Sequence, residues 1–369
     1  MVLVSLYSLF LAGLGVGLNG IENLFGPFIS TDADVGKLVE NAVNRGVREL
    51  FFTLEWSADP AILPKSLNTC KSLFHLKLSH NILVDFPTSS CFPSLEKLEL
   101  QYVMYKDEAS LVNLLSSCPV LESLVVKRNE DDNVAKFSVK VPSLRFLLYS
   151  NDNKSMTDEN DVVDAGRSLV MDTPALSQLN ISDCSEDSWS IKNMPCLQDA
   201  HISGQSFHDT SKLLRSASAV SSLGLHLTDE LAVYCSTNEF PQLIECTITP
   251  CDSDWMDSLL LFLGNTPKLK KITVDYRLTY EPPPVSASWM PRFPHPECLY
   301  SCLENFELID YGGREEKKEL VEYILIMSEC LKITATISMR SNLEDKETIM
   351  ETLNSLFLSF NNISFSVQT

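Results

Sequence analysis

Eleven segments of the chain repeat the same spacing of apolar residues, and this repeat limits the fold more than any other feature. After Pro119, apolar residues follow at two, five and seven positions, at Leu121, Leu124 and Val126. The last two lie two residues apart, which is the period of a strand with one buried face. Proline fits at the first residue of a strand, where its missing N–H costs no hydrogen bond of the ladder. Each copy therefore predicts one short strand.

The copies follow one another at a regular step. Seven begin with a proline and four keep the apolar spacing without it, with anchors at residues 45, 71, 93, 119, 142, 174, 195, 218, 241, 267 and 301. Most steps are 21 to 26 residues long, and two are 32 and 34. A step in the twenties that carries L-x-x-L-x-L is typical of leucine-rich repeats. The pattern predicts a solenoid, because each repeat buries its leucines only against its neighbours.

Helix-forming segments precede several of the predicted strands. Residues 31–44 place apolar side chains on one face, and Asp32 or Asp34 can cap this helix. Helices are also predicted before later strands, at residues 107–117, 209–216 and 254–264. Helices that alternate with strands at a short period predict parallel strands joined by right-handed crossovers. We therefore expect an α/β fold, with parallel strands on the concave face of the solenoid and helices or loops outside.

A proline-rich stretch predicts the main domain boundary. Residues 281–296 contain six prolines and are expected to form an extended linker. Residues 1–280 then form the leucine-rich-repeat solenoid, truncated at its N-terminus, and residues 297–369 form a separate C-terminal region. In that region we expect helices and strands in alternation, with helices at residues 315–327 and 345–356 and strands at residues 330–337 and 363–367. With the strand of the last repeat, they predict a βαβαβ unit that caps the solenoid.

The first 21 residues are uncharged and allow two interpretations. Leu6, Leu9 and Leu11 keep the L-x-x-L-x-L spacing, which predicts a further repeat strand at residues 5–11. Alternatively, the apolar stretch is a secretory signal or a membrane anchor, although no basic residues precede it. The second interpretation describes a secreted or membrane-anchored leucine-rich-repeat domain.

Charge and cysteine content limit the class of partner. The net charge of −20 leaves no excess of Lys and Arg for phosphates, which argues against nucleic acid. The eleven cysteines are odd in number and show no metal-ligand spacing. Cys118, Cys196, Cys246 and Cys302 lie in or beside repeats, where we expect small buried hydrophobic residues. This use of cysteine favours a reducing compartment, the cytoplasm or the nucleus, and we expect no membrane partner.

The sequence predicts no catalytic, cofactor-binding or metal site. It contains no G-x-S-x-G, H-E-x-x-H or P-loop motif. Residues 15–20 match G-x-G-x-x-G, but a Gly-Pro pair soon afterwards excludes the helix that a dinucleotide site needs. His75, His201 and His226 fall between repeat leucines, so we expect them on the exposed strand face. We therefore expect a non-catalytic protein without a cofactor.

The repeat does predict a binding surface. Because the repeat leucines point into the core, the residues between them should line the concave sheet. These candidates are Lys97, Glu99, Gln101, Ser123, Val125, Lys127, Gln178, Asn180, Ser182, Asp199, His201, Ser203, Lys271, Thr273 and Asp275. They are mixed in charge and contain few aromatic residues, so they define no ligand class. Repeat surfaces of this kind usually bind another protein.

Particular segments also resemble a known family. The repeat segments Val-Arg-Glu-Leu, Cys-Lys-Ser-Leu, Phe-Pro-Ser-Leu-Glu-Lys-Leu-Glu-Leu and Cys-Pro-Val-Leu-Glu-Ser-Leu resemble the plant F-box/LRR family; they lie at residues 47–50, 70–73, 92–100 and 118–124. Residues 302–325, which include Tyr-Gly-Gly-Arg-Glu-Glu, are similar to the FBD region at the C-terminus of that family.

The resemblance implies a role in ubiquitin ligation. Family members are substrate receptors of SCF-type cullin ubiquitin ligases, in which an N-terminal F-box docks on a Skp-type adaptor and the repeats hold the target. No L-P-x-x-L…L-S-x-R-W-like segment precedes the first repeat of this chain. The resemblance therefore implies binding of an unknown target protein. A Skp-type adaptor is implied as a partner only if an F-box is supplied upstream.

Overall fold

The computed structural model divides the chain into two compact units. Unit 1 comprises Met1–Cys196 with Gly204–Asp209, and unit 2 comprises Leu197–Ser203 with Thr210–Thr369. The structure describes residues 2–4, 32–54, 60–128, 132–151, 168–183, 188–192, 194–204, 210–227, 231, 233, 235, 237–251, 255–277, 295–328, 331–340, 346–360 and 363–368. Each unit is described below by itself.

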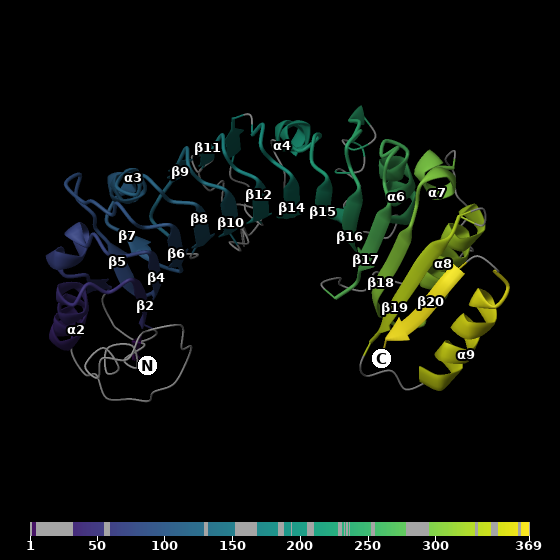
Figure 1. Cartoon of the computed structure of the whole chain (residues 1–369), viewed down its shortest axis with the longest axis horizontal. Coiled ribbons are helices and arrows are strands. Elements are labelled where there is room, and N and C mark those ends of the chain that lie inside the picture. Colours follow the sequence, from purple (N-terminus) through teal and green to yellow (C-terminus); the bar gives the residue numbers. More distant parts are fainter. Residues whose placement is uncertain are drawn as a thin grey trace, which may run out of the picture. The chain divides into compact units, whose positions relative to one another are not determined.

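The main sheet of unit 1 is built from parallel repeat strands. One strand comes from each repeat, and neighbours in sequence are neighbours in the sheet: β2 (Glu49–Leu54), β4 (His75–His80), β6 (Lys97–Gln101), β8 (Ser123–Lys127), β10 (Phe146–Asn151) and β12 (Gln178–Asp183). Figure 1 shows these strands side by side along one side of the unit. The predicted parallel repeat architecture is confirmed.

Two columns of apolar side chains form the core beneath this sheet. Register partners in successive strands supply one residue each: Leu50, Leu76, Leu98, Leu124, Leu147 and Leu179 in one column, and Phe52, Leu78, Leu100, Val126, Tyr149 and Ile181 in the other. None of these residues is more than 5% exposed. Burying a side chain of this size contributes roughly 1.5 to 3 kcal/mol. The residues five and seven positions after each anchor are therefore core residues.

The opposite side of unit 1 contains more strands than the sequence predicts. Two helices lie there as expected, α2 (Asp32–Asn44) and α3 (Glu108–Ser116), with a short 3-10 helix at Lys65–Thr69. Two parallel three-stranded sheets accompany them, formed by β3 (Ala61–Ile62), β5 (Ile82–Val84) and β7 (Met104–Tyr105), and by β9 (Lys136–Lys140), β11 (Ser168–Asp172) and β13 (Ser188–Ile191). Figure 1 places α3, β9 and β11 away from the main strands. The expectation of helices or loops alone was incomplete.

The N-terminal strand departs from the parallel pattern. β1 (Val2–Val4) pairs antiparallel with β2. The predicted repeat strand at residues 5–11 and the glycine motif at residues 15–20 lie outside the described residues.

Unit 2 continues the repeat with the same geometry. Its repeat strands are parallel and in register: β14 (Asp199–Gly204), β15 (Ser222–Leu227), β16 (Glu245–Pro250) and β17 (Lys271–Asp275). The predicted helices are α4 (Thr210–Ser216) and α6 (Trp255–Leu263). The columns persist, because Leu223 pairs with Cys246 and Leu225 with Ile248, all of them buried.

The C-terminal region forms the expected βαβαβ unit. After a short helix, α7 (Glu297–Ser301), strands and helices alternate as β18 (Asn305–Tyr311), α8 (Glu315–Met327), β19 (Ile333–Met339), α9 (Lys346–Phe357) and β20 (Ile363–Gln368). The three strands are parallel, as the green-to-yellow arrows of β18, β19 and β20 in Figure 1 show. β19 begins at residue 333, later than predicted, and places Ala335 and Ile337 in the two core columns although its sequence lacks the repeat spacing.

The βαβαβ unit joins the repeat sheet directly. β17 and β18 pair in register from Lys271 with Asn305 to Asp275 with Ile309. The proline-rich stretch at residues 281–296 falls in this connection and lies outside the described residues except for its last two, so the boundary there stays a prediction. Behind the sheet, the buried ammonium of Lys317 in α8 lies 3.7 Å from the ring centroid of Tyr276, which follows β17. This contact fastens α8 to the last repeat.

The cysteine expectation was half right. Cys118 and Cys246 are buried, each 2% exposed, as small hydrophobic residues should be. Cys196 is exposed and Cys302 is only half-buried, so for these two the expectation was wrong. Cys196 follows Pro195 directly in the turn that enters the repeat, before the first buried position at Leu197, and therefore faces solvent.

Candidate functional site

In-register pairing arranges the outward side chains of unit 1 in three rows. We call the outward face of β4, β6, β8, β10 and β12 the strand face of unit 1. Its first row is His75, Lys97, Ser123, Phe146 and Gln178; its second is Lys77, Glu99, Val125, Leu148 and Asn180; its third is Ser79, Gln101, Lys127, Ser150 and Ser182. Neighbours in a row lie about 4.8 Å apart, and neighbours along a strand about 7 Å apart.

All nine candidates that the sequence predicts in unit 1 lie on this face. Lys97 and Gln178 are exposed, and the other seven are half-buried: Glu99, Gln101, Ser123, Val125, Lys127, Asn180 and Ser182. The register therefore brings the predicted residues together on one surface. Their role in binding stays a prediction.

Glu99 is the carboxylate at the centre of the β4–β6 part of this face. Its Oε1 lies 3.0 Å from Nε2 of His75, and its Oε2 lies 3.5 Å from Nζ of Lys77 and accepts a 3.0 Å hydrogen bond from Gln101. The hydrogen bond with His75 is the main cause that lowers the pKa of Glu99; burial opposes it and Lys77 assists it. Glu99 is therefore ionised and already balanced by its neighbours.

Two apolar residues on the strand face of unit 1, Phe146 and Leu148, were not among the candidates predicted from the sequence. Phe146 and Leu148 point outward from β10, and Leu148 is the register partner of Val125 in β8. All three side chains are half-buried and keep part of their surface in water. We call Val125, Phe146 and Leu148 the apolar patch. The signal was present, because Phe146 and Leu148 occupy the alternate positions of the repeat that begins at Pro142.

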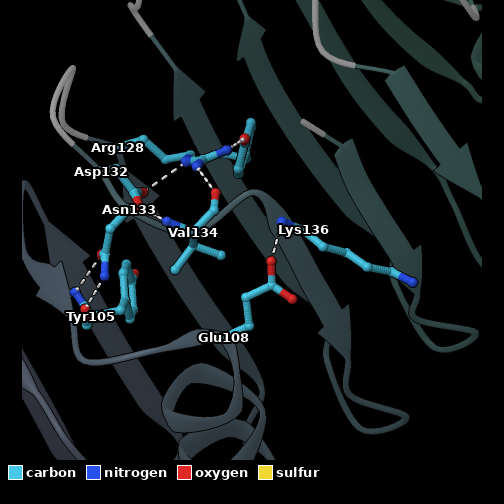
Figure 2. Close-up of polar contacts among 8 residues, drawn as sticks. Tyr105, Glu108, Arg128, Asp132, Asn133, Val134 and Lys136 are labelled. Carbon is cyan, nitrogen blue, oxygen red and sulfur yellow. Dashed lines mark hydrogen bonds and ion pairs between the residues drawn. The ribbon is translucent and has the colours of Figure 1, made fainter. Parts of the chain in front are cut away.

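A buried ion pair fixes the end of β8 beside this patch. Arg128 follows β8, and its Nε donates a 2.8 Å hydrogen bond to Oδ2 of Asp132, with the two side chains 0% and 1% exposed. Nη2 of Arg128 donates to the carbonyl of Val134 at 2.6 Å, and Nη1 donates to the hydroxyl of Tyr149 in β10 at 3.2 Å. Figure 2 shows the guanidinium facing both Asp132 and Val134. The backbone N–H of Arg128 also donates to Ser150, which ties β8 to β10.

Two further contacts hold the segment that follows. The side chain of Asn133 exchanges two hydrogen bonds with the backbone of Tyr105 in β7, and the backbone N–H of Lys136 donates to Glu108 at 2.9 Å (Figure 2). These contacts join the turn after β8 to the preceding repeat. The position of Lys127, the last residue of β8, is thus set by backbone and buried side chains on both sides.

The matching face of unit 2 contains two packed histidines. The ring of His201 in β14 lies over Gly224 of β15, where an added Cβ would come within 2.0 Å of Nδ1 of His201. The rings of His201 and His226 meet edge to face at 5.9 Å, and Nδ1 of His226 lies 3.1 Å from the hydroxyl of Ser203. The histidines, His75 included, lie on the strand faces as predicted, but half-buried rather than exposed, because their rings pack on neighbouring strands.

Burial governs the protonation of this pair. Desolvation lowers the pKa of His226 to about 4, the charge of His201 adds to this effect, and the carboxylate of Asp275 opposes it. Desolvation likewise lowers the pKa of His201, with Asp199 and Asp275 opposing. Both rings are therefore neutral near pH 7.

The remaining unit 2 candidates differ from the expected exposure. Asp199, Ser203 and Lys271 are half-buried on the strand face, as predicted. Thr273 and Asp275 are buried, at 5% and 9% exposed, so their expected exposure was wrong. The cause is local.

Neighbouring side chains cover these two residues. The hydroxyl of Thr273 donates to Glu307 of β18 at 3.3 Å. The guanidinium of Arg277 covers Asp275, with Nη2 2.6 Å from Oδ2. Burial works against ionisation of Asp275, but the hydrogen bonds from Arg277 outweigh it and lower the pKa of this carboxyl.

The described residues offer little for catalysis. They contain no group of three or more His, Cys, Asp or Glu that could hold a metal ion. Burial raises the pKa of Cys118, Cys235 and Cys298 to about 12, so these thiols stay protonated and are poor nucleophiles. Among the helices that the structure describes, none has the length and apolar character needed to traverse a lipid bilayer.

Comparisons with known proteins place the chain in a family. Residues 35–167 match the family model described as "FBD-associated F-box protein At5g56370, LRR repeats", and residues 294–337 match the FBD model. A putative FBD-associated F-box protein of Arabidopsis thaliana is 47% identical over 333 residues, which cover 88% of this chain and 74% of the relative. The chain belongs to the F-box/FBD/LRR-repeat family.

Other family members show a similar degree of likeness. A putative F-box/FBD/LRR-repeat protein of Arabidopsis thaliana is 43% identical over 339 residues, which cover 88% of this chain and 71% of the relative. Another is 39% identical over 333 residues, which cover 86% and 72%. No solved structure matches the chain. The LRR match of this F-box/FBD/LRR protein falls on most of α2 and on the repeat strands β2, β4, β6, β8 and β10 of unit 1, and the FBD match on α7, β18, α8 and most of β19.

Proposed function

We propose that the chain is a non-catalytic target-binding protein that resembles the target-recognition half of an SCF ubiquitin-ligase receptor. Its strand faces hold another protein, and an F-box, where one is present, supplies the contact with a Skp-type adaptor. The proposed compartment is the cytoplasm or the nucleus, in keeping with the cysteines of the described residues, which are free thiols and several of which are buried.

One observation carries this proposal: the apolar patch on the strand face of unit 1. Outward positions of a half-covered sheet are normally polar, and contiguous apolar side chains there mark an interaction site. The patch stands on two adjacent strands whose ends are fixed by the Arg128–Asp132 ion pair. A rigid surface binds with little loss of conformational entropy. The raised pKa values of the buried thiols and the lack of a metal-ligand group in the described residues give no support to an enzyme.

A site-specific photo-crosslinking experiment tests the proposal. A photoreactive amino acid is placed at Asn180 or at Ser182 on the strand face, and, as a matched control, at Ile62, which is 70% exposed on β3. In plant cell extract, the strand-face positions should yield a discrete crosslinked adduct that the Ile62 position does not yield. Adducts from Ile62 alone, or equal adducts from all three positions, would contradict binding at the strand face.

A second arm addresses the adaptor. Residues 32–369 should not bind a purified Skp-type adaptor, because the proposal assigns target binding to the repeats and adaptor docking to an F-box. Robust direct binding of the adaptor to residues 32–369 would overturn that part of the proposal.

A further inference from the structure

The charge on the strand face of unit 1 is opposite in sign to that of the whole chain. Its three rows contain three lysines and one glutamate, whereas the chain has 29 basic and 49 acidic residues. The preceding row of the same strands is not basic, because Glu96 and Glu122 stand there against Arg145 alone. The excess of positive charge is therefore local to the outward rows.

Two of the three lysines are available to a partner. Lys77 is engaged with Glu99 at 3.5 Å. Lys97 is exposed, contacts the ring of Phe74 at 5.8 Å, and forms no ion pair in the described part of the chain. Lys127 is half-buried and likewise forms no ion pair with any described residue. Within the part of the chain that the structure describes, Lys97 and Lys127 thus offer two cations without a carboxylate partner.

The apolar patch lies between and beside these cations. Lys97 shares the first row with Phe146, separated from it only by the small Ser123. Lys127 lies two residues after Val125 on the same strand and therefore on the same face. Leu148, beside Val125, completes an apolar surface with a lysine at each of two corners.

The spacing of the two lysines sets a length for the ligand. Lys97 and Lys127 stand one strand apart and two outward positions apart along the strands, which separates their Cα atoms by about 14 Å. An extended peptide spans that distance in about four residues. A carboxylate opposite each lysine then leaves room for one bulky apolar side chain over the patch.

We propose that the strand face of unit 1 binds a target segment with two acidic side chains about four residues apart and a bulky apolar side chain between them. This inference rests on the proposed function and names the chemistry of the target at the same site. The apolar contact supplies affinity, and the two lysines supply orientation and selectivity for an acidic segment.

The strand face of unit 2 provides an internal contrast. Its repeat strands carry Asp199, Glu245 and Asp275 against Lys271, whose ammonium lies 3.4 Å from Glu307 of β18. Acidic residues therefore outnumber basic ones there. An acidic segment that binds the strand face of unit 1 is disfavoured by like charge on the corresponding face of unit 2.

Selection from a displayed library of short random peptides tests the inference on the full chain. Wild-type protein should enrich peptides in which two Asp or Glu residues flank Leu, Ile, Phe or Trp. An enriched peptide should bind at least about tenfold more weakly to the Lys97→Glu/Lys127→Glu variant, and its salt dependence should largely disappear. Lys136→Glu is the matched control, because Lys136 is exposed on β9 of the outer sheet; it should bind like wild type.

A second variant tests the apolar part. Val125→Ser/Leu148→Ser should also weaken binding at least about tenfold while the unfolding midpoint stays close to that of wild type, since both side chains point outward.

Each remaining outcome overturns the inference. Enriched peptides that are basic or purely polar contradict the stated chemistry, and so do peptides that bind both double variants as tightly as wild type. Binding of single-stranded RNA by the protein in preference to acidic peptides also contradicts it. If such peptides still crosslink at Asn180 or Ser182, the proposed function stands and only the ligand class is wrong. A lack of any enrichment also rejects the inference, and the crosslinking experiment then judges the proposed function separately.

Discussion

The ion pair between Arg128 and Asp132 shows how strongly burial affects the contribution of an ion pair to stability. Both side chains are almost wholly removed from water, and their hydrogen bonds reach the backbone of Val134 and the hydroxyl of Tyr149. Removing charges from water is costly, and the cost is offset only while both partners are present. The exposed pair between Lys106 and Asp85, at 3.0 Å, has a similar length but is surrounded by solvent.

Arg128→Met should therefore destabilise the protein by about 3 to 5 kcal/mol, because Asp132 would remain buried without its facing guanidinium. Lys106→Met, the matched control, should cost under about 1 kcal/mol because its pair is exposed. Urea unfolding of the two variants measures the difference. Equal losses for both would show that the Arg128 contact is energetically no different from a surface pair.

His226 makes stability depend on pH. Its pKa is about 4 in the folded protein and about 6.5 when unfolded. Between these values the unfolded chain binds more protons, so the free energy of unfolding should fall as the pH is lowered from about 6.5 towards 4. In His226→Gln this slope should be shallower by up to one proton, as measured by urea unfolding at several pH values. An unchanged slope would mean that His226 titrates alike in both states.

At the scale of single elements, α3 illustrates why tertiary contacts and caps are needed together. A nine-residue helix is too short to be stable alone, and Leu111, Leu114 and Leu115 bury its inner face. The helix begins after Asp107, whose Oδ1 accepts hydrogen bonds from the backbone N–H of Ser110 at 2.7 Å and from its hydroxyl at 2.8 Å. The cap satisfies a donor that the helix itself cannot satisfy.

Asp107→Ala should destabilise the protein by about 1 kcal/mol through loss of this cap. Asp107→Asn retains an acceptor at the same place and should lose much less. Thermal and urea unfolding of both variants provide the comparison. If Asn and Ala prove equally costly, the loss comes from the charge of Asp107 rather than from its hydrogen bonds.

The elements also show which parts of the fold a sequence can reveal. The two core columns were predictable because every repeat strand places buried residues at the same spacing, as Leu98 and Leu100 do in β6. The outer sheets were not, because β3 has only two residues and β9 buries three consecutive ones, Phe137, Ser138 and Val139. Neither segment shows a period of two. Whether these segments form strands depends on their packing against neighbouring strands, which the local sequence does not show.

The sequence predicted which residues face outward at the candidate site, but not which of them neighbouring side chains cover. Alternation placed Lys97 and Lys127 on the outward face correctly. It could not show that Asp275 is covered by Arg277, or that His201 rests on Gly224, because both contacts depend on where neighbouring side chains lie. Phe146 and Leu148 were missed because the candidates did not include the repeat that begins at Pro142.

At the scale of the whole molecule, stability is shared between neighbouring repeats rather than held by one central core. Within unit 2, each strand from β15 to β19 pairs with a parallel neighbour on both sides. The βαβαβ unit covers the edge of β17 and the ends of the columns at Ile272 and Val274, both fully buried. Removing it would expose those apolar residues and an unpaired strand edge.

A chain that ends at residue 296 should therefore unfold at lower urea concentration and self-associate, because β17 would become an open edge. A shorter deletion of residues 361–369 removes only β20, whose inward residues Ile363, Phe365 and Val367 are half-buried, and should have a smaller effect. Size-exclusion chromatography with light scattering and urea unfolding distinguish the two. A monomeric 1–296 chain with an unchanged midpoint would show that the repeats need no cap on this side.

The register between β17 and β18 has a practical consequence. These strands adjoin residue for residue although residues 276–304 separate them along the chain. The register between β17 and β18 is therefore compatible with a long connection between the two strands. A fluorescent domain inserted into residues 281–296 should leave the register between β17 and β18 unchanged. The labelled protein could then be used to detect its binding partners in living cells.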